Sequence, residues 1–190
     1  MEQTKIFQEI KALLSRYHHP NDEVLRQIYP HVRAKSYDIK DMFIQVDEIS
    51  YRLCMITSGC AVAYKVIKGK RKLVALWKEG GLIIHAQSTL ASKKSEVDII
   101  FLSNSNTLEI NISDLNSLRQ TNPEINRYLD FILAEDMKRL SDHICWLKST
   151  KAKERIVYFR ENYKVLDNIL PEEQKAYYLN MSIRWYQKQK

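Results

Sequence analysis

Residues 123–149 read PEINRYLDFILAEDMKRLSDHICWLKS, and this stretch decides the fold. After Pro123 it contains no further proline and no glycine, and residues that favour helices dominate it. Asn122 or Thr121 is suited to cap its start, Pro123 suits the first helical position, and Glu124 complements the helix dipole. The stretch therefore predicts one helix of about seven turns, roughly 40 Å long.

Two apolar stripes run along this predicted helix. One starts with Ile125, Leu129 and Ile132 and is suited to pack on the first half of the chain. The other follows alternating spacings of four and three, which is typical of a seam with a second helix. Periodicity alone leaves open a core helix within one domain. The dimer interpretation is favoured because the helix joins two unlike parts of the chain. The predicted dimer seam consists of Leu133, Met137, Leu140, Ile144 and Leu147.

The composition indicates a folded chain with a net positive charge. The 190 residues are 45% hydrophobic, which is enough for a sizeable core, and the net charge is +7. That charge suits nucleic acid, although many ordinary proteins are as basic. Apolar runs are too short to cross a bilayer, so we expect no membrane partner. The cysteines Cys54, Cys60 and Cys145 are odd in number and scattered, which favours a reducing cytoplasm over a disulfide framework.

The region between Val32 and Ile112 is predicted to form about eight short strands, after two short helices. Its segments, such as Cys60–Ile67 and Leu82–Ala86, are rich in Val, Ile, Leu and Tyr. Turn signals separate them, and Lys68–Gly69 sits between two apolar runs as a hairpin turn does. Closely spaced short strands with little helix between them predict an antiparallel sandwich or roll.

Two interruptions of the strand pattern are predicted to be helical. Small polar residues in Gln87–Lys94 leave room for one helical turn. Ser113–Asp114 is suited to cap a short helix, Leu115–Gln120, that leads into the long one.

The chain after Ser149 is predicted to form short basic helices. The first covers Lys151–Tyr163, and a second is opened by Pro171 at its first turn and runs to Leu179. Asn180 suits the left-handed conformation of a tight turn, and Ser182 suits the cap of a last helix, Ile183–Lys190. Two short helices joined by such a turn make a helix-turn-helix pattern, although any helical hairpin looks similar.

The order of these elements resembles that of the Crp/Fnr-type transcription regulators, the relatives of the cyclic AMP receptor protein. Residues 51–83, YRLCMITSGCAVAYKVIKGKRKLVALWKEGGLI, are similar to the β-roll of the family. Residues 154–182, ERIVYFRENYKVLDNILPEEQKAYYLNMS, resemble the compact DNA-binding end of its Bacteroidetes branch. That branch has a Tyr-Leu-Gly-Ile-Ser/Thr turn before the recognition helix, and Tyr178–Leu179–Asn180–Met181–Ser182 stands in its place.

The resemblance implies an α+β fold in three parts. Residues 1–122 would form an antiparallel β-roll with N-terminal helices, like a cyclic-nucleotide-binding domain. Residues 123–149 would form a dimerisation helix, and residues 150–190 a helix-turn-helix domain. The implied protein is a cytoplasmic homodimer that binds a palindromic DNA operator and responds to a small-molecule or protein effector.

The cyclic-nucleotide motif of the family is degenerate in this chain. Relatives that bind cyclic nucleotides carry a Gly-Glu pair for the ribose and, further along, an Arg for the phosphate. Here Ile84–His85 and Ser95–Glu96 stand in those places, and Ser95 cannot supply the fixed cation that a phosphate needs. We therefore expect an effector other than cyclic AMP. Lys93 and Lys94 are close enough in sequence to form a weaker anion site. The alternative is that both are solvated side chains of a loop. The predicted effector pocket consists of Ile84, His85, Lys93, Lys94 and Ser95.

The predicted recognition helix also departs from the family. Relatives usually carry Glu-Thr-x-Ser-Arg, where this chain has residues 184–188, RWYQK. Arginine, glutamine and lysine are side chains that contact base edges and phosphates. The alternative is a solvated helix whose Trp185 and Tyr186 pack on the domain, in an interaction module that does not bind DNA. The predicted DNA-binding residues are Ser182, Arg184, Gln187, Lys188 and Lys190.

Enzyme, metal and cofactor chemistry is not predicted. The sequence has no P-loop, no Rossmann glycine pattern and no nucleophile elbow. Its histidines show no metal-ligand spacing with one another or with cysteine. No cysteine precedes Cys54, whereas relatives with an iron–sulfur cluster hold it with cysteines near the N-terminus. We therefore expect a protein without catalytic residues, a metal or a cofactor.

Overall fold

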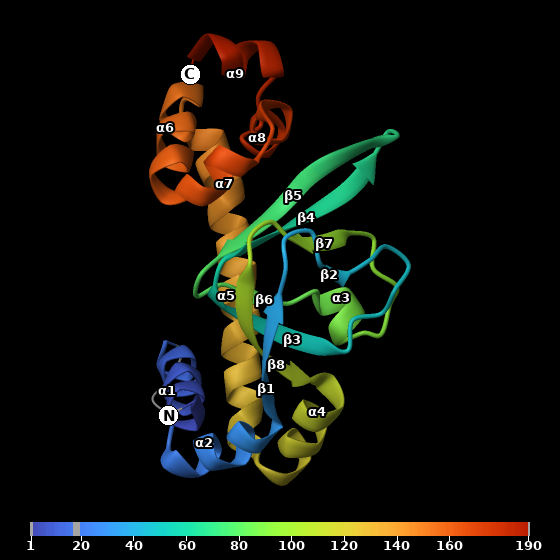
Figure 1. Cartoon of the computed structure of the whole chain (residues 1–190), viewed down its shortest axis with the longest axis vertical. Helices are drawn as coiled ribbons and strands as arrows, with labels where there is room; N and C mark the ends of the chain where they lie inside the picture. Colours follow the sequence, from blue (N-terminus) through green and yellow to red (C-terminus); the bar gives the residue numbers. More distant parts are fainter. Residues whose placement is uncertain (1, 17–19, 190) are drawn as a thin grey trace.

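The computed structural model describes residues 2–16 and 20–189. The long helix α5 (Pro123–Ser149) runs along the molecule, and the strands lie beside it (Figure 1). The N-terminal helices lie near one end of α5, and the C-terminal helices gather at the other end. Lys190, a predicted DNA contact, lies outside the described residues.

Two antiparallel sheets form the roll. The described part of the chain contains eight strands, arranged as two four-stranded sheets. This result confirms the predicted antiparallel β architecture. The first sheet has the order β1 (Val32–Tyr37), β8 (Ser105–Asn111), β3 (Arg52–Ser58), β6 (Leu82–Ile83). The second has the order β2 (Met42–Ile44), β7 (Asp98–Phe101), β4 (Cys60–Ile67), β5 (Lys70–Lys78).

The first sheet separates two apolar cores because its side chains alternate between its faces. On β3, Cys54 and Ile56 face the interior of the roll, whereas Leu53 and Met55 face the N-terminal helices. The roll interior is filled by the chain's own side chains, among them Phe101, whose ring stacks on Tyr37 at 4.1 Å.

A tight hairpin joins β4 and β5 and extends from the roll (Figure 1). Lys68 and Gly69 both have positive φ, 50° and 72°, as a two-residue type I′ turn requires. The predicted turn is therefore confirmed, and β4 has the bounds that the sequence predicted.

The smaller helices match the prediction less closely. Helices α1 (Glu2–Ser15) and α2 (Asp22–Ile28) and the 3₁₀ turn Tyr29–His31 precede β1. The predicted strand Leu82–Ala86 is wrong at its end, because β6 stops at Ile83 and α3 (Ala86–Thr89) begins at Ala86. Helix α4 (Ile112–Thr121) begins earlier than expected. Asn111 holds its N-cap position, so the predicted cap at Ser113–Asp114 is wrong.

Helix α5 has the bounds that its capping residues predicted. The Asn122 side chain accepts a hydrogen bond from the Glu124 amide at 3.0 Å, and Pro123 occupies the first helical position. Ile125, Leu129 and Ile132 are buried against the N-terminal helices and the first sheet, as predicted for the stripe that they begin. The first half of α5 is therefore a core helix.

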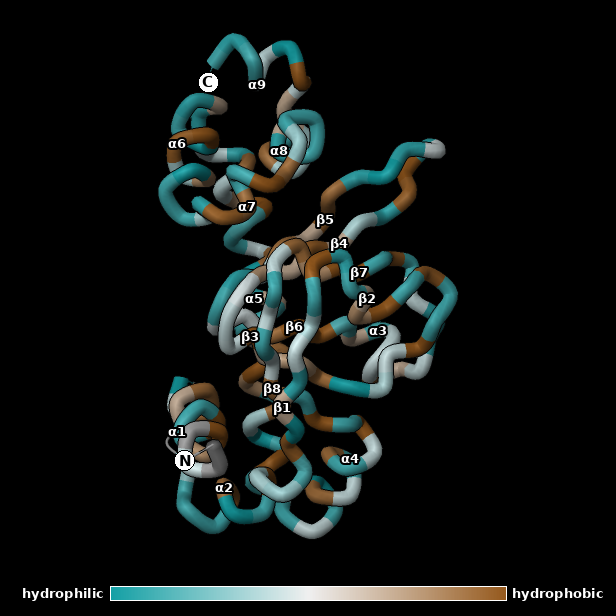
Figure 2. Tube along the Cα trace, viewed as in Figure 1, coloured by the Kyte–Doolittle hydropathy of each residue, from teal (hydrophilic) through white to brown (hydrophobic). Residues whose placement is uncertain are grey.

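Four short helices follow α5: α6 (Ala152–Asn162), α7 (Lys164–Ile169), α8 (Glu172–Tyr178) and α9 (Ile183–Gln189). Helix α7 was not predicted, and Pro171 lies at the N-cap of α8 rather than in its first turn. Teal and brown segments alternate along these helices, as amphipathic packing requires (Figure 2). Their buried side chains share one apolar cluster with Val62, Leu73 and Leu76 of the β4–β5 hairpin. Within the described residues, no helix combines the length and hydropathy needed to cross a membrane.

Candidate nucleic-acid interface

Helices α8 and α9 pack together around a tight turn. Asn180 has a φ of 52°, the left-handed conformation predicted for it. The Ser182 hydroxyl accepts a hydrogen bond from the Trp185 amide at 3.2 Å and so caps α9, also as predicted. We call helices α6 to α9 the C-terminal unit. Leu179 and Tyr186 are almost fully buried and pack α8 and α9 against the rest of this unit.

The opposite face of α9 is open to solvent. Arg184, Gln187 and Lys188 are all exposed, so the structure brings these predicted residues onto one face. The Gln187 amide donates a hydrogen bond to the Glu172 carboxylate at 3.1 Å, which ties this side chain to α8. The interaction-module alternative predicted that both Trp185 and Tyr186 pack on the domain. Tyr186 is buried, whereas Trp185 is 45% exposed.

Buried charged residues that were not predicted hold the C-terminal unit together. The ammonium group of Lys175 donates hydrogen bonds to the carbonyl and the carboxylate of Asp167, at 2.8 and 2.9 Å. Arg155 is also buried and donates to the carbonyl oxygen of Leu147 at the end of α5. The partners in each bond lie eight positions apart but on different helices, so the periodicity of a single helix cannot reveal them.

Helix α8 is also clasped to the edge of the roll. The Gln174 side chain accepts a hydrogen bond from the Leu73 amide and donates one to the Arg71 carbonyl, both at 2.9 Å. Lys72 forms an ion pair with Glu173 at 3.0 Å and lies 5.0 Å from the centre of the Tyr177 ring. The C-terminal unit is therefore bound to strand β5 as well as to α5.

The second half of α5 presents an apolar stripe to solvent. Met137, Leu140 and Ile144 of the predicted seam are 72%, 45% and 51% exposed. Leu133 instead packs against the N-terminal core, and Leu147 is partly buried. Phe131, Ala134 and Cys145 are also exposed on α5, but the helical spacing puts them to one side of this stripe.

The predicted effector residues are placed in a loop region that is already bonded to itself. Ser95 is 2% exposed, and its hydroxyl donates to the Val97 carbonyl at 2.7 Å. Its own backbone is hydrogen-bonded to Asp47 and Glu48. Ile84 is buried and belongs to the N-terminal core cluster. The Ser95 hydroxyl is therefore committed to its own loop.

In the described part of the chain, no hydrogen bond links His85, Lys93 or Lys94 to Ser95. His85 caps α3, because its Nδ1 accepts a hydrogen bond from the Ser88 amide at 3.2 Å. Burial lowers the pKa of its imidazole below the usual 6.5. Lys93 and Lys94 are exposed. Beside them, Glu96 forms an ion pair with Lys65 at 2.5 Å, so an acid occupies this part of the surface.

The roll interior holds a buried carboxylate that the sequence prediction missed. Glu109 accepts hydrogen bonds from Tyr37 at 2.5 Å and Thr107 at 3.2 Å, and Arg52 lies 3.4 Å away as its ion-pair partner. Its charge is thus balanced within the roll rather than offered to a ligand. Among the described residues, no group of three or more His, Cys, Asp or Glu side chains is placed to hold a metal ion.

Comparisons with known proteins identify the fold. No protein-family profile matches the sequence, and no curated protein matches it. The structure is similar to FixK2 from Bradyrhizobium japonicum, with a TM-score of 0.66 and 15% identity over 83% of this chain and 82% of that one. It is similar to the c-di-GMP responsive global regulator CLP from Xanthomonas campestris, with a TM-score of 0.64 and 15% identity over 88% and 89%. A cyclic nucleotide-binding domain from Methylobacillus flagellatus gives a TM-score of 0.68 and 16% identity over 77% and 85%.

These neighbours include regulators of the Crp/Fnr type. At such low sequence identity the similarity shows the fold alone. The chain therefore has a Crp/Fnr-like regulator fold, in which the roll corresponds to a cyclic-nucleotide-binding domain.

Proposed function

We propose that this protein is a homodimeric, DNA-binding transcription regulator of the Crp/Fnr type that responds to a signal other than a cyclic nucleotide. The observation that carries the proposal is the exposed face of α9, where Arg184, Gln187 and Lys188 project from a packed helical pair. Helix α8, the turn at Asn180 and helix α9 then act as the helix-turn-helix. This turn supports placing the chain in the Bacteroidetes branch, since Asn180 takes the left-handed conformation otherwise supplied by glycine.

The side chains on this face suit the major groove. Arg184 can donate two parallel hydrogen bonds to a guanine, and Gln187 can pair in the same way with an adenine. Lys188 suits a phosphate, which adds affinity without sequence preference. The Ser182 hydroxyl is used to cap α9, so we assign it a positioning role. Lys190 stays a predicted phosphate contact.

The apolar stripe on α5 supports the homodimer. Met137, Leu140 and Ile144 stay exposed in the single chain, and a second copy of α5 would cover them. A two-fold axis along this stripe would present two copies of α9 to one DNA molecule. The operator would then be an imperfect palindrome with half-sites about one helical turn apart, or roughly 34 Å.

The roll does not offer the chemistry that a cyclic phosphate needs. Ser95 supplies no cation and is already hydrogen-bonded, and Glu96 beside it would repel an anion. Loss of a charge-assisted contact costs about 2–5 kcal/mol in binding. The proposed effector is therefore a different kind of molecule or a protein.

A protein-interaction module is the second candidate function. The observation that favours it is the exposure of Ile183 and Trp185 on α9, 37% and 45%, because aromatic residues are enriched in protein interfaces. In that case α9 would contact a protein through these apolar side chains, and Arg184 would not read DNA.

Arg184→Ala and Lys188→Ala test the DNA-binding function. On a site selected from random DNA, Arg184→Ala should weaken binding by about 1–3 kcal/mol, with much less effect on random DNA. Lys188→Ala should weaken binding to both DNAs alike and reduce the salt dependence. If neither variant changes binding to either DNA while Trp185→Ala abolishes capture of a protein partner, the interaction module is the better account.

A further inference from the structure

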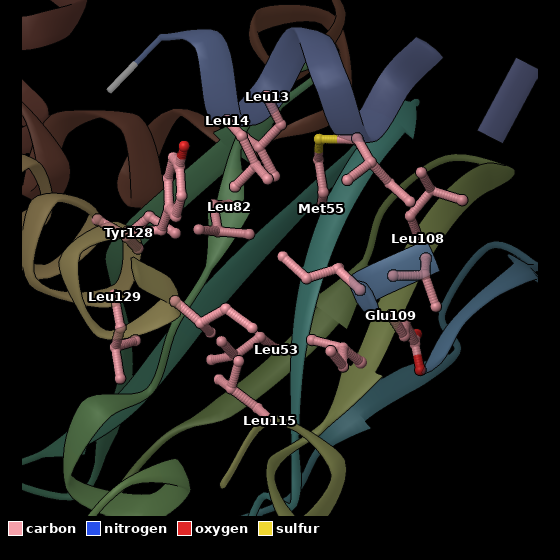
Figure 3. A pocket seen from close by; sticks show the side chains of 16 residues that line it. Leu13, Leu14, Leu53, Met55, Leu82, Leu108, Glu109, Leu115, Tyr128 and Leu129 are labelled. Atoms are coloured by element: carbon pink, nitrogen blue, oxygen red, sulfur yellow. The ribbon is translucent and has the colours of Figure 1, made fainter. Parts of the chain in front are cut away.

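A cavity of about 90 Å³ lies under the N-terminal helix, outside the roll interior. Leu13 and Leu14 of α1 line it opposite Leu53 and Leu108 of the first sheet, and Leu129 of α5 lines another wall (Figure 3). None of the five residues predicted from the family's cyclic-nucleotide motif lines this cavity. It is therefore a separate place in the fold.

The lining of the cavity is almost entirely hydrocarbon. Glu109 and Tyr128 are the polar residues among the 16 that line it. The Glu109 carboxylate is engaged by Tyr37 and Thr107 within the roll. A buried water needs about two to four polar partners, which this lining does not provide. The cavity therefore favours an apolar occupant.

The size of the cavity limits that occupant. An apolar cavity of about 150 Å³ accepts benzene. The cavity here has room for a smaller hydrocarbon group, and for a benzene ring if neighbouring side chains shift. Met55 lies in the wall and has the flexible thioether side chain that adapts most readily to such a change.

Helix α1 covers the cavity and is held by apolar packing as well as by surface contacts, because Ile10 and Leu14 are buried in the N-terminal core. Arg16 donates a hydrogen bond to the Gly80 carbonyl at 2.7 Å, and Lys11 lies 3.8 Å from Asp22 in an exposed ion pair. Exposed pairs of this kind contribute little to stability. Entry of a ligand would therefore require a local opening of α1, in which Ile10 and Leu14 leave their apolar contacts for a time.

We propose that this cavity is a binding site for a small, uncharged apolar ligand, such as a hydrocarbon group no larger than a benzene ring. Ile125, Tyr128, Leu129 and Ile132 of α5 line the cavity, so the occupant would contact the helix that leads to the C-terminal unit. A signalling role for this ligand rests on the proposed regulatory function, whereas its binding does not.

Benzene is the probe, and phenol is its matched polar control. In thermal melting of the full chain, benzene should raise the melting temperature in a saturable way, and ligand-observed NMR should give its affinity. Phenol should bind at least about tenfold more weakly, because its hydroxyl would be buried without a partner. Equal binding of phenol and benzene would contradict an apolar site.

Cavity variants locate the binding. Leu108→Phe and Met55→Phe should each fill the space and abolish benzene binding, whereas Leu108→Ala should enlarge it and tighten binding. Val66→Phe, on the exposed hairpin, should change nothing. The proposal is overturned if benzene does not bind to the unaltered chain. It is also overturned if both phenylalanine variants melt cooperatively and still bind benzene with unchanged affinity. None of these readouts involves DNA, so a failure of DNA binding would count against the regulator alone.

Discussion

Individual residues bear on the prediction that this roll does not bind a cyclic nucleotide. That prediction puts Ser95 in the place of a phosphate-binding arginine and His85 in the place of a ribose-binding acid. In the structure, the hydrogen bonds of Ser95 run to Val97 and to the loop at Asp47–Glu48. His85 caps the helical turn α3. Both side chains therefore have structural partners, as the proposal of a different effector requires.

His143 is expected to make the protein less stable in mild acid. Burial lowers the pKa of its imidazole below the usual 6.5, and Arg139 lowers it further. A histidine with a lower pKa in the folded state binds protons more readily when unfolded. Its contribution to stability is therefore present above about pH 6.5 and is lost as the pH falls through the folded-state pKa. The His143 ring stacks on Tyr178 at 4.8 Å, so this loss would loosen the contact of α5 with α8.

Thermal melting of His143→Phe against the unaltered protein checks this pH dependence. The variant keeps an aromatic ring but cannot titrate, so its melting temperature should fall less between about pH 7 and pH 5. A part of the fall should remain, because burial also lowers the pKa of His85. Identical pH profiles of the two proteins would show that His143 does not contribute.

At the scale of elements, helix α5 has two halves with different roles. Its first half is buried by the chain's own core, and its second half leaves Leu140 and Ile144 exposed. Leu140→Glu combined with Ile144→Glu should give monomers that still fold, because these side chains contribute little to the fold of one chain. The mass in solution should halve by light scattering, since unpaired charges would be placed in an apolar interface.

The control for this change lies on the neighbouring face of α5. Lys138→Asp with Asp142→Lys reverses an exposed ion pair of 2.5 Å and leaves the apolar stripe intact. This variant should keep the mass of the unaltered protein. A dimer mass for the double glutamate variant would place the interface elsewhere.

Gln174 is expected to fasten the C-terminal unit to β5. Gln174→Ala removes two hydrogen bonds to the strand backbone, each worth about 0.5–1.5 kcal/mol. Amide hydrogen exchange at Leu73 should become faster. Gln187→Ala also removes a glutamine hydrogen bond, but within the C-terminal unit, and should leave Leu73 unchanged. Equal exchange at Leu73 in all three proteins would contradict the clasp.

Elements with local signals could be predicted from the sequence, whereas contacts between distant residues could not. Asn122 and Pro123 mark the start of α5, and Lys68–Gly69 mark the hairpin, because capping and positive φ depend on neighbouring residues. Helix α7 was missed because it is only six residues long, which is too short for a periodic pattern. The exposed face of α9 was predicted from its spacing. The clasp of Gln174 on β5 and the backbone hydrogen bonds of Ser95 to Asp47 and Glu48 depend on residues that folding brings together.

At the scale of the whole molecule, the roll and the C-terminal unit are joined twice. Helix α5 connects them along the chain, and the apolar cluster shared with Leu73 and Leu76 connects them through space. A change in the roll can therefore reach α9 through the helix and through the hairpin. Such a layout suits a protein that couples a sensing part to a binding part, as the proposed regulator requires.

Selection of binding sites from random DNA with the full chain tests the central claim most directly. A dimer that presents two copies of α9 should enrich an imperfect palindrome whose half-sites are about one helical turn apart. Binding to the enriched site should weaken steeply as salt increases, because phosphate contacts release counterions. Enrichment of no sequence, together with no retention on DNA at low salt, would contradict the regulator and favour the interaction module.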